Sequence, residues 1–101
     1  MLKSLKEVEK KLFEEIINTI IEIQTSFDLY RKNPSSSNEL RINNFLNKYL
    51  EEVSREVSLK KQKTYYRHIL RIILFNTTKY NKKIVTRWAN ILHEKIGDVQ
   101  C

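Results

Sequence analysis

The sequence contains only one glycine, one proline and one cysteine in 101 residues. A β-sandwich of this length needs turn residues about every ten positions. Their scarcity argues against that class and favours long helices joined by few loops. Cys101, the last residue, is the only cysteine, so no intramolecular disulfide can form. This cysteine usage is typical of reducing compartments, and we expect an intracellular, cytoplasmic protein with an unreactive terminal thiol.

Long apolar runs are also missing. No run approaches the roughly 18–20 residues of a membrane span, and the charged start, MLKSLKEVEKK, does not look like a signal peptide. We therefore expect no membrane partner. Apolar residues still make up 41% of the chain, which is enough for the core of one small domain.

Residues suited to catalysis or metal binding are few. His68 and His93 have no cysteine or carboxylate at ligand spacing beside them, whereas a metal site needs three or four converging ligands. The carboxylate pairs Glu14–Glu15 and Glu51–Glu52 point about 100° apart on a helix, and we expect them to be solvated. No glycine-rich phosphate loop occurs. The sequence therefore predicts no metal, no cofactor and no enzymatic activity.

Hydrophobic periodicity predicts an all-α fold: a single-domain, small four-helix bundle with short connections. The helices are expected at about 4–31, 38–57, 60–75 and 79–96. The first opens with the capping box Ser4–Glu7. Its apolar stripe comprises Leu5, Val8, Leu12, Ile16, Ile20, Ile23, Phe27 and Tyr30. Phe13, Ile17 and Ile21 widen this stripe, which makes them candidates for docking a partner protein.

The other helices have boundary signals of their own. Ser36 and Glu39 suggest a second capping box after the loop KNPSSSN. The apolar stripe that runs from Ile42 to Val57 is out of phase with the next one, so a break capped by Ser58 is expected. We predict an N-cap at Thr77 or Thr78 for the last helix. Gly97 is expected as its left-handed C-cap.

The predicted core positions follow from these stripes. The second helix contributes Ile42, Phe45, Leu46, Tyr49, Leu50, Val53 and Val57. The third contributes Tyr66, Ile69, Leu70 and Ile73. The fourth contributes Ile84, Val85, Trp88, Ile91, Leu92 and Ile96.

Charge is distributed unevenly along the chain. The net charge is +7, yet residues 1–33 carry six basic and six acidic residues, and residues 34–59 carry three basic and four acidic ones. Residues 60–101 carry ten basic and only two acidic residues, and no acid occurs over residues 57–93. A normal polar helix face mixes both signs. The excess of positive charge in the second half of the chain therefore predicts an anionic partner.

The most regular cations are Lys60, Lys63, Arg67 and Arg71, which we call the basic stripe. Their spacing of three, four and four places them on one helix face, away from Tyr66, Ile69 and Ile73. Lys79, Lys82, Lys83 and Arg87 follow and complete the predicted nucleic-acid-binding set.

This set predicts phosphate contacts without sequence readout. The free amides of the helix start behind Thr78 add to the expected anion site. Tyr65 and Tyr80 are placed to stack on bases. A helix-turn-helix, with Asn81, Lys82 and Arg87 near the front of a recognition helix, is a less favoured arrangement.

The short, loop-poor, isoleucine- and lysine-rich chain resembles the small accessory subunits of archaeal family-B DNA polymerase holoenzymes. The resemblance lies in size, charge and helical character and includes no motif. It implies a non-enzymatic accessory or adaptor protein of DNA replication or repair. Such a protein would dock on a polymerase or another replication enzyme and contact DNA phosphates.

Two alternatives remain open. NNFLNKYLEEVS followed by KTYYRHILRIIL resembles the first two helices of tyrosine-recombinase core-binding domains. The tyrosine of the T-x-x-Y step falls one or two positions early after Thr64, and no catalytic domain follows. This resemblance implies a stand-alone DNA-binding domain. The other alternative is a regulatory protein whose basic face binds an acidic protein surface.

Overall fold

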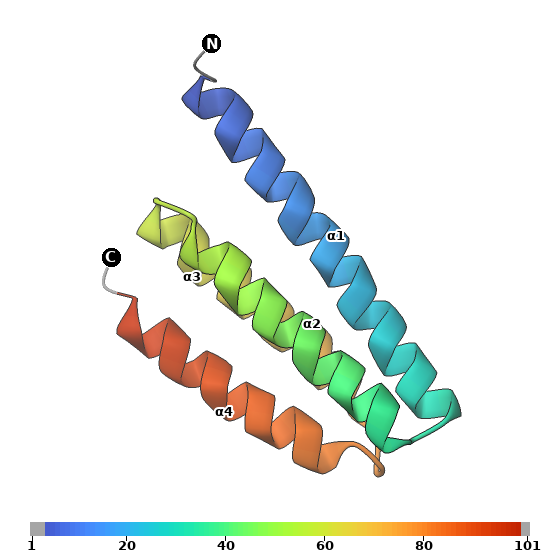
Figure 1. The fold of residues 1–101 in the computed structure, drawn as a ribbon. Coiled ribbons are helices and arrows are strands. Elements are labelled where there is room, and N and C mark those ends of the chain that lie inside the picture. The colour runs from blue at the N-terminus through green and yellow to red at the C-terminus, as the bar shows by residue number, and fades with distance from the viewer. Residues whose placement is uncertain (1–3, 100–101) are drawn as a thin grey trace.

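The computed structural model describes residues 4–99, except for the side chain of Leu5. This part of the chain contains four α-helices. They are α1 (Leu5–Lys32), α2 (Ser36–Ser54), α3 (Leu59–Phe75) and α4 (Lys82–Asp98). Successive helices run in opposite directions, and connections of three, four and six residues join them (Figure 1). The predicted all-α four-helix bundle is confirmed, and Cys101 lies outside the described residues.

Two predicted helix starts are confirmed. The Ser4 hydroxyl accepts a hydrogen bond from the Glu7 amide, and the Ser58 hydroxyl accepts one from the Lys61 amide. Each satisfies an amide that the first helical turn leaves without a partner. The phase shift between the second and third apolar stripes therefore marks a true break between α2 and α3.

The predicted bounds of α2 are wrong at both ends. Ser35, not Ser36, is the N-cap, and its hydroxyl accepts from the Asn38 amide rather than forming a box with Glu39. The serine run offers several hydroxyls, and the choice depends on where the chain leaves α1. At the other end the helix stops at Ser54. Val57 lies in the connection and is 86% exposed, so it is not a core residue.

The connection between α3 and α4 is longer than predicted. The N-cap of α4 is Asn81 rather than Thr77 or Thr78, and the Asn81 side chain is buried. Its Oδ1 accepts from the Thr78 amide at 2.7 Å, and its Nδ2 donates to the Asn76 carbonyl at 2.9 Å. One side chain thus satisfies two backbone groups within the six-residue turn.

We expect Asn81→Ala to lower the free energy of unfolding by about 2 kcal/mol, because two polar groups lose partners in a mostly buried turn. Thermal unfolding followed by circular dichroism should show a midpoint lower by roughly 10 °C. Asn90→Ala is the matched control, since Asn90 is exposed on α4. Equal midpoints for the two variants would show that the Asn81 hydrogen bonds do not hold the turn.

Gly97 is not a left-handed C-cap. The helix α4 continues through Gly97 to Asp98, and no described residue has a positive φ. A Cβ built at Gly97 would meet no atom within 4 Å. The glycine is therefore an exposed position in the last turn, and Val99 is the C-cap.

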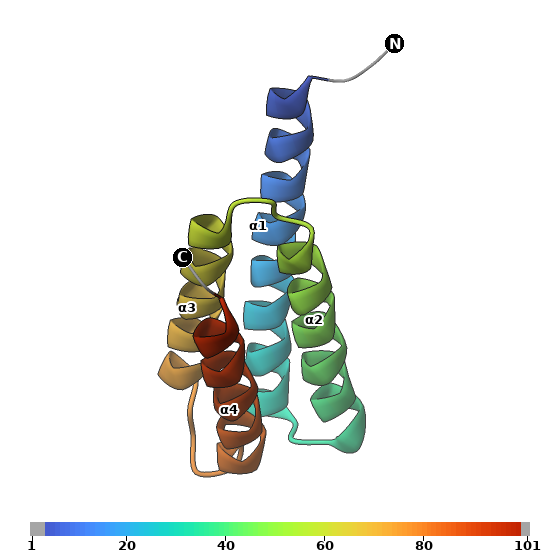
Figure 2. The same ribbon diagram turned by 90° about the vertical axis from the view of Figure 1, so that its left-hand side faces the viewer.

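The core lies along the centre of the bundle and follows the predicted stripes, with one exposed exception on α1. Five further predicted positions are only partly buried and pack against the core: Ile20, Phe45, Leu50, Ile91 and Ile96. The buried apolar residues are Leu12, Ile16, Ile23, Phe27, Tyr30, Ile42, Leu46, Tyr49, Val53, Tyr66, Ile69, Leu70, Ile73, Ile84, Val85, Trp88 and Leu92. The exception is Val8, which is 50% exposed. The N-terminal part of α1 extends beyond the other three helices (Figure 2).

A buried carboxylate fixes α2 against α1. We expected Glu52 to be solvated, but it is 3% exposed and accepts from the Thr19 hydroxyl of α1 at 2.5 Å. Its neighbour Glu51 is exposed. The 100° between adjacent helical side chains, which argued against a catalytic pair, is the reason that one carboxylate faces α1 while the other faces solvent.

Two further hydrogen bonds tie α2 to the second half of the chain. The Tyr49 hydroxyl donates to the Tyr65 carbonyl of α3 at 2.6 Å, and the Trp88 Nε1 of α4 donates to the Asn43 Oδ1 at 2.8 Å. Burial, more than the neighbouring Tyr65, raises the pKa of the Tyr49 phenol. The phenol therefore keeps its proton and its donor role at neutral pH.

Candidate nucleic-acid interface

The basic stripe lies on α3, on the side of the helix away from the buried Tyr66, Ile69 and Ile73, and is called the α3 basic stripe from here on. Lys60, Arg67 and Arg71 are exposed, and Lys63 is partly exposed. Eleven residues separate the first cation from the last, a distance of about 16 Å along the helix. That length corresponds to about five base pairs of duplex DNA at 3.4 Å per pair. The stripe can therefore contact several phosphates at once.

The two halves of the chain differ in how their cations are neutralised. Within residues 4–99, the ion pairs join Arg31 to Asp28, Arg41 to Glu22 at 3.0 Å, and Arg55 to both Glu15 at 2.9 Å and Glu51 at 3.1 Å. All lie on α1, α2 or the residue that follows α2. No described cation of α3, the following turn or α4 forms an ion pair, so the positive field of the stripe is not cancelled locally.

The structure separates the cations of α4 onto two sides of that helix. Lys82 lines a shallow hollow with Leu74 and Thr77, on the side that faces α3. Arg87 lies over the ring of Trp88, with its Cζ 5.8 Å from the ring centroid. The same indole donates a hydrogen bond to Asn43 of α2. Five positions separate Lys82 from Arg87, about 140° around the helix.

Lys83 is on the Arg87 side by the same count, only about 40° away. The eight predicted cations therefore do not form one surface. Lys82 lies on the side of α4 that faces α3, whereas Lys83 and Arg87 lie on a different side of that helix. Sequence periodicity alone left the rotation of α4 against its neighbours open.

The turn before α4 carries an exposed cation and an exposed ring. Lys79 Nζ lies 5.0 Å from the centroid of the Tyr80 ring, and Tyr80 is 67% exposed. This cation–π contact holds the lysine over one ring face. The start of α4 lies at Asn81 rather than behind Thr78, so the free amides predicted there are displaced by three residues.

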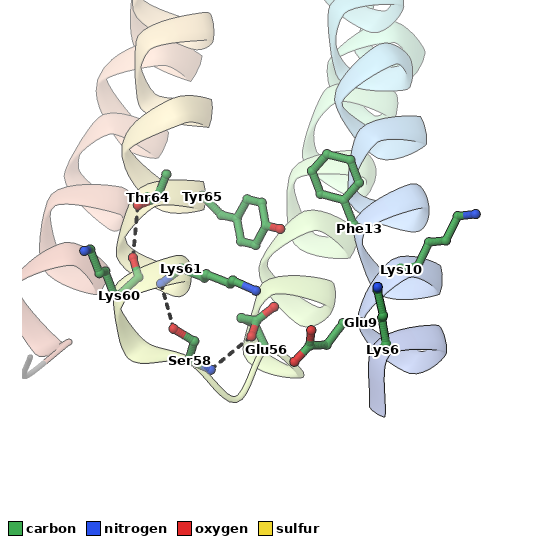
Figure 3. Close-up of a pocket in the computed structure, with 10 residues that line it drawn as sticks. All are labelled: Lys6, Glu9, Lys10, Phe13, Glu56, Ser58, Lys60, Lys61, Thr64 and Tyr65. Carbon is green, nitrogen blue, oxygen red and sulfur yellow. Dashed lines mark hydrogen bonds between the residues drawn. The ribbon is translucent and has the colours of Figure 1, made fainter. Parts of the chain in front are cut away.

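Tyr65 does not flank the α3 basic stripe. Two positions from Arg67, it points about 200° away from it around the helix and faces Phe13 of α1 across a groove (Figure 3). Burial, and then the charge of Glu56, raises the pKa of the Tyr65 phenol. Of the two tyrosines predicted to stack on bases, Tyr80 is therefore the more exposed one.

The groove between α1 and α3 was not predicted. It encloses about 740 Å³ and combines the rings of Phe13 and Tyr65 with four lysines: Lys6, Lys10, Lys60 and Lys61. We call it the aromatic–lysine groove. Its two walls come from segments about fifty positions apart, so no local pattern could have revealed it. The sequence signal was limited to the extra width of the α1 apolar stripe.

The helix-turn-helix hypothesis is wrong. α3 and α4 run antiparallel side by side (Figure 2), whereas that motif sets two helices at about 90–120° across a turn of three or four residues. The connecting turn has six residues. Asn81 is buried in it and cannot reach a base edge. The arrangement of α3 and α4 therefore lacks the recognition helix that this hypothesis requires.

Among residues 4–99, no three histidine, cysteine, aspartate or glutamate side chains gather in a group that could hold a metal ion. None of the helices in this range combines the length and the apolarity that crossing a bilayer requires. Four other shallow hollows formed by the described residues are smaller than the aromatic–lysine groove, at about 410 Å³ or less.

Comparison with known proteins gives no match: no family model, curated protein or solved structure is similar to this chain. The resemblances to polymerase accessory subunits and to recombinase core-binding domains therefore stay predictions. Any functional interpretation depends on the side chains and charges described above.

Proposed function

We propose that this chain is a non-enzymatic basic accessory protein of nucleic-acid machinery, in DNA replication or repair. It holds DNA through phosphate contacts made by the α3 basic stripe, while a second surface docks on a partner enzyme. The observation that carries the proposal is a row of four accessible cations on one helix face, without an ion-pair partner among the described residues.

The physical basis is counterion release. Each lysine or arginine that neutralises a DNA phosphate frees condensed cations, and the gain depends on salt but not on base sequence. Cations already paired with carboxylates, as Arg41 and Arg55 are, would have to give up those contacts first. The cations of the stripe have no such cost. The stripe is therefore the favoured phosphate-binding surface of this chain.

The docking role is proposed for the exposed apolar residues of α1. Phe13 is 50% exposed, Ile17 39% and Ile21 55%. They lie four positions apart and form one ridge along the helix, which we call the α1 apolar ridge. Apolar side chains gathered in this way are typical of protein interaction surfaces.

The alternative of an acidic protein partner uses the same cations, so only a direct binding experiment separates the two. For the recombinase-like alternative, the residues that resemble the T-x-x-Y step lie within α3. Tyr66 is buried, and the Thr64 hydroxyl donates to the Lys60 carbonyl of its own helix. Both residues therefore serve the fold, which favours the accessory-protein proposal.

Binding to short labelled duplexes of unrelated sequence tests the proposal. We expect similar affinity for each duplex at about 50 mM salt, with a loss of roughly 100-fold on raising the salt to about 200 mM if four phosphates are contacted. Fluorescence anisotropy measures both. Absence of binding at the lower salt concentration would refute the nucleic-acid role, and a preference for one duplex would refute the non-specific mechanism.

A further inference from the structure

The N-terminal end of α1 lacks neighbours. α1 has 28 residues and α2 has 19, which correspond to about 42 Å and about 28 Å. The surplus projects past the α2–α3 connection (Figure 2). Near this end of α1, Val8 is 50% exposed, and Phe13, which lies opposite Tyr65 of α3, is also 50% exposed. The start of α1 therefore offers apolar surface to another molecule.

The aromatic–lysine groove lies beside this projecting end. Phe13 of α1 and Tyr65 of α3 face each other across it, and the Lys61 side chain extends from α3 toward α1 (Figure 3). A volume of about 740 Å³ is ample for one large apolar side chain with part of its backbone. The rings are placed to pack on an aromatic or branched aliphatic anchor.

The groove has a net positive rim. Four lysines line it against two carboxylates, Glu9 and Glu56. Glu56 is 5% exposed, and its Oε1 accepts from the Ser58 amide at 3.0 Å. That carboxylate is therefore already engaged in shaping the α2–α3 connection. A ligand that matches this groove therefore has an apolar anchor for the rings and acidic groups for the lysines of the rim.

The α1 apolar ridge continues the groove along α1. Phe13 belongs to both, and Ile17 and Ile21 extend the apolar surface by about 12 Å. Anchors of an amphipathic helix recur at i, i+3 or i+4 and i+7 and span a similar length. A nucleic-acid strand has bases for the groove but no aliphatic surface for the ridge. The combination therefore favours a protein segment over an oligonucleotide.

We propose that the aromatic–lysine groove and the α1 apolar ridge together bind an amphipathic, acidic segment of a partner protein. Its apolar anchors lie on Phe13, Ile17 and Ile21, and its carboxylates face the lysines of the groove. This rests on the docking role proposed above and names the chemistry of the partner. The α3 basic stripe stays available for DNA because only Lys60 is common to both surfaces.

An unbiased selection tests this inference. The full chain is used to select binders from a library of random peptides about 16 residues long, enough for the helical anchor spacing. We expect the selected peptides to share apolar residues at helical spacing with flanking aspartate or glutamate. Replacing their acidic residues by amides should weaken binding about tenfold, because the rim charges then lose their partners.

Variants of the chain locate the binding site. The double variant Phe13→Ser with Ile17→Ser should weaken the selected peptides at least about tenfold, since exposed anchors of this kind dominate helix-in-groove binding. Lys61→Glu should weaken them as well. The matched control is Leu40→Ser with Phe75→Ser, which removes apolar side chains that are 58% and 90% exposed elsewhere. It should bind as the parent chain does.

Three outcomes would overturn the inference: peptides without an acidic and apolar pattern, equal binding by the double variant and its control, or no selected peptide at all. A single-stranded oligothymidylate is the competing ligand. If the double variant lost affinity for it, the groove would be a nucleic-acid site instead. Failure here with intact duplex binding leaves the DNA role standing, whereas peptide binding without duplex binding refutes only the DNA role.

Discussion

Replacing all four cations of the α3 basic stripe by serine is expected to lower the affinity for duplex DNA by roughly 100-fold or more at about 50 mM salt, because each lost phosphate contact removes one release of counterions. The substituted positions are accessible and outside the core. The helical content and the unfolding midpoint should therefore stay close to those of the parent chain. Fluorescence anisotropy with a labelled duplex measures the affinity.

A charge-matched variant separates local contact from general attraction. Lys11, Lys32 and Lys48 of α1 and α2 and Lys95 of α4 are exposed cations outside the stripe and outside the ion pairs of the described residues, and serine at these positions removes the same four charges. We expect this control to lose less than about tenfold in affinity, since the stripe is retained. If both variants weaken binding to the same degree, net charge rather than the stripe accounts for it.

Trp88→Ala is expected to cost about 3–5 kcal/mol of unfolding free energy, the usual cost of truncating a large core side chain. Trp88 is 1% exposed, and it joins α4 to α2 through the hydrogen bond to Asn43. Domains of this size are stable by about 5–15 kcal/mol. The unfolding midpoint should therefore fall by roughly 15 °C or more, measured by circular dichroism because the only tryptophan is removed.

Trp88→Phe distinguishes packing from the hydrogen bond. Phenylalanine keeps much of the buried ring but cannot donate to Asn43, so we expect a loss of about 1–2 kcal/mol. An alanine variant that unfolds within about 5 °C of the parent would contradict the place of Trp88 at the centre of the bundle. A phenylalanine variant as unstable as the alanine variant would assign the effect to the hydrogen bond.

Helix identity and core composition were predictable because both depend on local periodicity. The break before α3 is the clearest case: the stripes differ in phase, and Ser58 caps the new start as expected. Boundaries were less predictable where several polar side chains compete. Ser35 takes the cap from Ser36, and Asn81 takes it from Thr78, because each choice depends on the path of the chain between helices.

The candidate surfaces were predictable only within a single helix. Spacing alone placed the α3 basic stripe and the α1 apolar ridge on their faces. Spacing also separates Lys82 from Arg87 around α4, but the neighbouring helix that each one faces depends on how α4 is rotated against α2 and α3. The groove depends on Phe13 and Tyr65 facing each other from two helices. Glu52 was misjudged for the same reason, since its partner Thr19 lies 33 positions away.

The central claim is that the α3 basic stripe itself contacts DNA phosphates. The dependence of log affinity on log salt concentration, compared between the stripe variant and its charge-matched control, tests this most directly. With four contacts, the slope of the stripe variant should be shallower than that of the parent chain by about 3–4 units, while the control keeps nearly the parent slope. Equal slopes for the two variants would contradict the claim.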